Sequence, residues 1–178
     1  MKLLRTIRLD ASDTFIFPKA AEPGEWAVAG AFAFWDRDPA TLEGKARSAF
    51  RGGFLGLSSL GWSTLAQIVE ASEAERGQVV DLLTQQLLAQ FGAPTADMAR
   101  AAAAAEVAFA ESLCSQPLDT LIAVHRSVEA GEVHETFRTL RPRARNSPAR
   151  AFSFLEVEGG DEPSEAVDLI GLAGRERK

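Results

Sequence analysis

The chain contains only two histidines, His125 and His134, and they lie close enough in sequence to act together. They belong to the segment VHRSVEAGEVHETF, in which Ala130-Gly131 predicts a two-residue turn between antiparallel strands. Pairing Val128 with Val133 across this turn aligns the apolar positions of the two strands. In that register both histidines lie on the face that points away from the core, as diagonal neighbours.

This face has the residue types of a metal site. Two imidazoles and a carboxylate are a common ligand set for transition metals, and Glu132 would supply the carboxylate, with Glu129 as the alternative. The predicted metal ligands are therefore His125, His134 and Glu132. The competing interpretation, which we favour, is the ordinary solvated face of an antiparallel ribbon, because the hairpin alone supplies too few ligands.

The opposite face of the same hairpin is predicted to meet the core. Arg126 and Glu135 fall opposite each other on this face and are expected to form an ion pair across the strands. The apolar residues of the face are Ile122, Val124, Val128, Val133 and Phe137.

The segment RTLRPRARNSPAR, Arg138 to Arg150, contains five arginines and no acidic residue. Arginine suits phosphate and carboxylate groups, so Arg141, Arg143 and Arg145 are candidates for binding an anion or a nucleic acid. Acidic residues follow directly and would compete for these arginines, and no aromatic residue lies between the arginines to stack on bases. Nucleic-acid binding is therefore disfavoured.

No complete catalytic motif is found. The cluster RGGFLGLSSLG, residues 51–61, matches neither common phosphate-loop pattern and is predicted to be a loop or helix terminator. Cys114 lies near a predicted helix C-terminus, where a thiolate is disfavoured, so it is expected to be a packing residue. We assign no catalytic residue and no cofactor, and the balance leans away from an enzyme.

Composition places the chain among globular proteins, with 46% apolar and 25% charged residues. The formal charge of -6 disfavours general attraction to nucleic acid or anionic lipid. The longest apolar stretch, residues 26–35, is too short to span a bilayer as a helix, and Arg5 and Arg8 interrupt any signal sequence. With a single cysteine, no internal disulfide can form, and the cytoplasm is the predicted location.

Periodicity and turn residues predict helices at 39–52, 73–91 and 95–115. Strands are predicted at 3–9, 14–17, 26–35, 62–70, 119–128, 133–141 and 150–157. This order favours an α+β fold: a largely antiparallel sheet of about six or seven strands, with about three helices packed on one face. We expect a single domain over residues 1–160, followed by an acidic C-terminal tail, 161–178, that could hold a short helix near 163–170.

Three segments, MKLLRTIRLDASDTFIF, GEWAVAGAFAF and GKARSAFRGGFLGL, resemble an uncharacterised alphaproteobacterial protein family of unknown function. The resemblance covers most of the chain, and its motifs are structural segments rather than catalytic signatures. It implies an accessory role at most.

The favoured function is thus a non-catalytic cytoplasmic accessory domain that binds a protein partner or self-associates, through an edge strand or the alanine-rich helix. The first alternative is a metal-dependent enzyme or metal-binding protein that uses the His125/His134 face. The second is anion or nucleic-acid binding through the Arg138–Arg150 segment.

Overall fold

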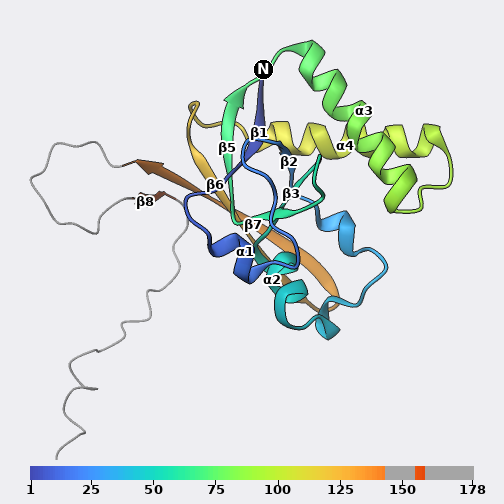
Figure 1. Cartoon of the computed structure of the whole chain (residues 1–178), viewed down its shortest axis with the longest axis horizontal. Coiled ribbons are helices and arrows are strands. Elements are labelled where there is room, and N and C mark those ends of the chain that lie inside the picture. Colours follow the sequence, from blue (N-terminus) through green and yellow to red (C-terminus); the bar gives the residue numbers. More distant parts are fainter. Residues whose placement is uncertain (143–154, 159–178) are drawn as a thin grey trace, which may run out of the picture.

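An eight-stranded sheet forms the centre of the structure, a computed structural model that describes residues 1–142 and 155–158. The strand order is β4-β3-β2-β1-β5-β6-β7-β8, and every neighbouring pair is antiparallel. Figure 1 shows that the sheet curls instead of lying flat. The strands are β1 (Lys2–Ile7), β2 (Trp26–Val28), β3 (Phe54–Gly56), β4 (Trp62–Ser63), β5 (Leu65–Glu70), β6 (Leu121–Glu129), β7 (Glu132–Pro142) and β8 (Leu155–Glu158).

Two long helices form a layer beside this sheet (Figure 1). The longer begins at the predicted capping box, in which the Ser72 hydroxyl accepts from the Glu75 N–H and the Glu75 carboxylate accepts from the Ser72 N–H. The second helix packs against β1 and β2 through small buried residues, which allow close approach. The helices of the described residues are α1 (Ser12–Ile16), α2 (Gly44–Gly52), α3 (Glu73–Gln90) and α4 (Ala96–Ser112), with short 3-10 helices η1 (Ala31–Phe34) and η2 (Pro39–Thr41).

The hairpin of β6 and β7 has the predicted register. Val128 pairs with Val133, and Arg126 lies opposite Glu135. The connecting residues have positive φ angles, 52° at Ala130 and 85° at Gly131, as the predicted two-residue turn requires. At the hairpin tip, Val128 and Val133 are 39% and 44% exposed, so these two residues do not reach the core as expected.

Several local predictions were wrong. Residues 14–17 were expected to be a strand, but Ser12–Ile16 forms helix α1. The expected strand at 26–35 ends at Val28, because Gly30 adopts a left-handed conformation with φ 82° and turns the chain into η1. There Phe34 packs against Trp62, with ring centroids 5.1 Å apart, instead of continuing a strand.

The glycine-rich segment contains more regular structure than expected. Residues 51–61 were expected to form only a loop or terminator, but they end α2 and supply β3. The expected strand at 62–70 is divided at Thr64 into β4 and β5, and the expected helix at 39–52 is divided into η2 and α2 by extended residues at Leu42 and Glu43. These additions raise the strand number above the expected six or seven.

The α+β class and the antiparallel sheet are confirmed. None of the helices in the described part of the chain has the length and apolar character needed to cross a bilayer. The tail 161–178, with its expected helix near 163–170, lies outside the described residues, and so does the expected domain boundary at 160. Of the predicted strand at 150–157, only β8 is described.

Two glycines provide a test of this architecture. A Cβ at Gly30 would lie 2.6 Å from the Leu55 Cβ in a left-handed backbone, whereas a Cβ on Gly77 within α3 would meet nothing within 4 Å. Gly30→Ala should therefore cost more than about 1 kcal/mol of unfolding free energy, and Gly77→Ala should add about 0.5–1 kcal/mol. Urea unfolding of the two variants measures both values. Equal effects of the two substitutions would contradict the placement of Gly30.

Candidate functional site

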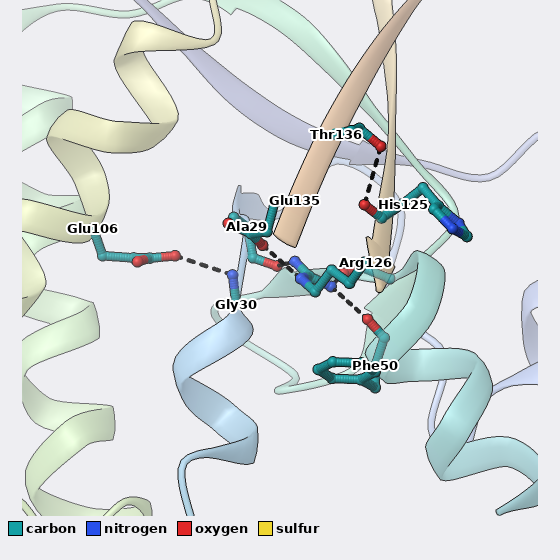
Figure 2. Close-up of polar contacts among 9 residues, drawn as sticks. Ala29, Gly30, Phe50, Glu106, His125, Arg126, Glu135 and Thr136 are labelled. Atoms are coloured by element: carbon teal, nitrogen blue, oxygen red, sulfur yellow. Dashed lines mark hydrogen bonds and ion pairs between the residues drawn. The ribbon is translucent and has the colours of Figure 1, made fainter. Parts of the chain in front are cut away.

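A buried arginine on β6 organises the most distinctive polar cluster of the molecule. The Arg126 side chain is fully buried, and its Nε donates to the Glu135 Oε1 at 2.6 Å. The predicted ion pair across the hairpin is therefore present. Figure 2 shows the guanidinium enclosed between the hairpin, the start of η1 and the end of α2.

Three backbone carbonyls complete the surroundings of this guanidinium. Nη1 donates to the carbonyl oxygens of Phe50 and Gly53, each at 2.9 Å, and Nη2 donates to that of Ala29 (Figure 2). Phe50 lies in the last turn of α2, where carbonyls lack partners within the helix and where a positive charge is favourable. Arg126 thus binds the end of α2 and the end of β2 to the hairpin.

Burial lowers the pKa of the Arg126 guanidinium from its ordinary value, and the charge of Glu135 opposes this shift. An arginine remains protonated in proteins despite such a shift, so the cluster contains a permanent buried cation. Because this cation has one carboxylate and three carbonyl partners, its charge is compensated within the fold.

A second carboxylate approaches the same region from α4. The Glu106 Oε1 accepts a hydrogen bond from the Gly30 N–H at 3.0 Å (Figure 2). Burial raises the pKa of the Glu106 carboxyl, repulsion from Glu135 adds to the increase, and the Gly30 N–H and Arg126 oppose it. This residue links α4 to the left-handed turn that ends the β2 segment.

A pocket of about 380 Å³ adjoins the cluster on the side of α2. Two arginines of α2, Arg47 and Arg51, line it together with Ser127 of β6. The apolar part of its wall includes Pro39, Phe50 and Val128.

The polar face of the hairpin is arranged as the sequence predicted, with His125 opposite Thr136 and His134 opposite Ser127. Both histidines and Glu132 are exposed. Across residues 1–142 and 155–158, no group of three or more His, Cys, Asp or Glu side chains is placed to hold a metal ion. A metal site built on His125, His134 and Glu132 stays a prediction that needs further ligands.

The predicted anion-binding arginines fall at the edge of the described chain. The backbone of Arg141 pairs with Glu156 in the ladder between β7 and β8. Arg143 and Arg145 lie outside the described residues. Their role stays a prediction.

A glutamate of the protein itself binds the glycine-rich loop. The carboxylate of Glu25 is buried and accepts hydrogen bonds from the N–H groups of Ser58 and Ser59, at 2.6 and 2.8 Å, and from the Ser59 hydroxyl. These N–H groups are therefore not free to bind a phosphate. The loop is therefore held by the protein's own carboxylate.

Cys114 is buried, and burial raises the pKa of its thiol to about 11. The Sγ donates to the Ala110 carbonyl at 3.3 Å. It is a protonated packing residue at neutral pH, as the sequence predicted.

Helix α1 presents apolar side chains to solvent. Phe15 is 73% exposed and Ile16 40%. Leu9, which precedes the helix and lines a recess with Asp13, is 62% exposed, and we call these three residues the α1 surface. On the opposite side of the helix, Asp13 is buried and accepts hydrogen bonds from the Thr64 hydroxyl and N–H, at 2.5 and 3.3 Å.

Sequence reasoning placed Arg126 on the core face but missed its three carbonyl partners. The available signal was a charged residue at an inward position of a strand, which requires several acceptors to be buried. Glu106 was also missed, although it lies on the buried stripe of α4 between Ala103 and Ala110. Glu25 and Asp13 gave no comparable signal, because their partners come from distant segments.

A family model described as a family of unknown function (DUF6505) matches residues 1–153, and the chain belongs to this family. The expected resemblance to an uncharacterised family is confirmed, while the match does not test the expected bacterial source. No curated protein and no solved structure matches the chain. No activity comes with the family, so a function has to be argued from the geometry.

The raised pKa of Glu106 predicts a pH-dependent substitution effect. The folded protein binds the Glu106 proton more tightly than the unfolded chain, so the contribution of this group to stability is lost as pH rises through the raised pKa. Glu106→Gln stays neutral and keeps an oxygen for the Gly30 N–H. The unfolding free energy of Glu106→Gln minus that of the wild type should therefore increase from pH 4 to pH 8.

Urea unfolding at several pH values across this range measures the difference. Glu129→Gln, which makes the same chemical change at an exposed hairpin position, is the matched control. A Glu106→Gln difference that stays constant, or that decreases as pH rises, would refute the assigned environment of Glu106.

Proposed function

We propose that this member of a family of unknown function is a non-catalytic, cytoplasmic accessory domain that binds a partner protein through the α1 surface. The observation that carries the proposal is the 73% exposure of Phe15, an aromatic side chain held in solvent by a helix that is anchored from its other side.

The anchoring follows from helical geometry. Asp13 and Phe17 are one helical turn apart and are both buried, Asp13 by its hydrogen bonds to Thr64 and Phe17 by 2% exposure in the core. Phe15 lies midway between them in sequence, and two residues correspond to about 200° of rotation in a helix. Its side chain is therefore directed away from the protein.

Keeping these side chains in water is unfavourable. Burying a Phe, Leu or Ile side chain is worth about 1.5–3 kcal/mol relative to leaving it exposed. A partner that covers Leu9, Phe15 and Ile16 would recover this free energy, and aromatic residues are common central anchors of protein interfaces. A preformed α1 also reduces the ordering cost of binding.

Parts of the surfaces first expected to self-associate are engaged inside the fold. On the alanine-rich α4, Ala99, Ala103 and Ala110 are buried. At the β4 edge, Trp62 is already hydrogen-bonded to the chain before β2, since its N–H donates to the Lys19 carbonyl and its carbonyl accepts from the Ala21 N–H. These contacts favour the α1 surface as the place where a partner binds.

Site-specific photocrosslinking tests this proposal. Phe15→p-benzoylphenylalanine should give one discrete crosslinked product in native cells, and its mass identifies either a second copy of the chain or a different protein. The matched control carries the same crosslinker at Trp35, which is 72% exposed and lies outside the α1 surface.

The product should disappear when Leu9→Ser and Ile16→Ser are added, because these changes remove the other two apolar side chains of the proposed interface. A product that forms equally from position 35, or that survives the two serine substitutions, would rule out the α1 surface as the interface.

A further inference from the structure

We propose that the pocket between α2 and β6 binds a small organic anion, with a phosphate or carboxylate head group and an apolar body. The site rests on residues other than those of the α1 surface and does not depend on partner binding.

The head group would be held by two arginines. Arg47 and Arg51 are four residues apart on α2, so their side chains lie on the same helical face, and both line the pocket. Both residues are exposed, and neither side chain forms an ion pair or hydrogen bond with another residue of the described chain. Two adjacent guanidinium groups without partners suit an oxyanion with several acceptor oxygens.

Two aspartates in the segment before α2 have partners elsewhere. None of the described lining residues is acidic. The Asp38 carboxylate accepts from the Ala40 N–H at 2.9 Å, where it caps η2, and Asp36 lies 3.9 Å from Arg37. The pocket is therefore a positively charged recess on a protein whose net charge is -6.

The wall formed by β6 adds a neutral donor. This strand pairs with β5 only through Leu121, Ile122 and Ala123, so farther along it one edge faces α2 instead of another strand. Peptide groups of successive residues in a strand point to opposite edges, so one of Ser127 and Val128 directs its N–H to the open edge.

The apolar body of the ligand would lie against Pro39, Phe50 and Val128, which form the rest of the wall. The volume of about 380 Å³ falls within the range of about 300–1,000 Å³ that is usual for small-molecule sites. A few converging polar groups beside an apolar wall are the normal composition of such sites.

Arg126 fixes the two walls of the pocket, α2 and β6, to each other. Its guanidinium donates to the Phe50 carbonyl, so the end of α2 is fixed to β6 at the base of the pocket. Its role is positioning, because its charge is already compensated by Glu135 and the carbonyls. The helix that carries Arg47 and Arg51 is thus anchored to β6 before binding.

The test is an NMR titration of the ¹⁵N-labelled protein with phenyl phosphate and, separately, with benzoate. For at least one probe we expect saturable amide shifts confined to three segments, which are residue 40, residues 47–51 and residues 127–128. Uncharged phenol should produce no saturable shift, because it lacks the head group.

Arg47→Gln/Arg51→Gln should weaken binding by about tenfold or more, since a lost charge-assisted hydrogen bond costs more than a neutral one. Arg47 and Arg51 are exposed, so the double variant should keep its fold, which its own amide spectrum verifies. Lys45→Gln is the matched control, because it removes a positive charge from the same helix outside the pocket, and it should change affinity by less than about twofold.

The proposal is overturned if neither probe binds, or if the shifts fall outside the three segments. It is equally overturned if the double arginine variant binds as well as the wild type, or if Lys45→Gln weakens binding to the same extent.

Discussion

The guanidinium of Arg126 is the contact on which the shape of the sheet depends. In the strand order, β5 and β1 lie between β6 and β2, and β3 lies one strand beyond β2. Arg126 nevertheless reaches the carbonyls of Ala29 and Gly53, which flank β2 and β3. It therefore connects two distant parts of the curled sheet. A buried cation is stable there only because all of its partners are in place.

The hydrogen bonds of Arg126 also position the α2 pocket, the two histidines and Glu106. The same hydrogen bonds fix the end of α2 against β6, and this juncture forms the walls of the α2 pocket. The hairpin orientation they require leaves His125 and His134 on the solvent side. Glu106, from α4, joins the cluster through Gly30, so the helical layer and the sheet share one polar centre. The α1 surface is separate and is set by Asp13.

Local interactions made part of the fold predictable. The hairpin register follows from a two-residue turn and matched apolar residues, and α3 from its capping box, because in each case the determining residues are close in sequence. Helix α1 was missed because Asp13 is fixed by Thr64, and η1 because Phe34 packs against Trp62. In the site, Glu135 was predictable as the cross-strand partner of Arg126. The carbonyl partners lie 73 to 97 residues away in sequence, beyond any local pattern.

The most direct test of this account compares the unfolding free energies of Arg126→Met and Arg100→Met with that of the wild type. Arg100 also pairs with a carboxylate, that of Asp81 at 2.7 Å, but this pair is exposed. If Arg126 closes the curled sheet, its replacement should cost about 3–5 kcal/mol, because it leaves three carbonyls and the partly buried Glu135 carboxylate without their partner. Arg100→Met should cost less than about 1 kcal/mol. Equal, small losses for both variants would contradict the account.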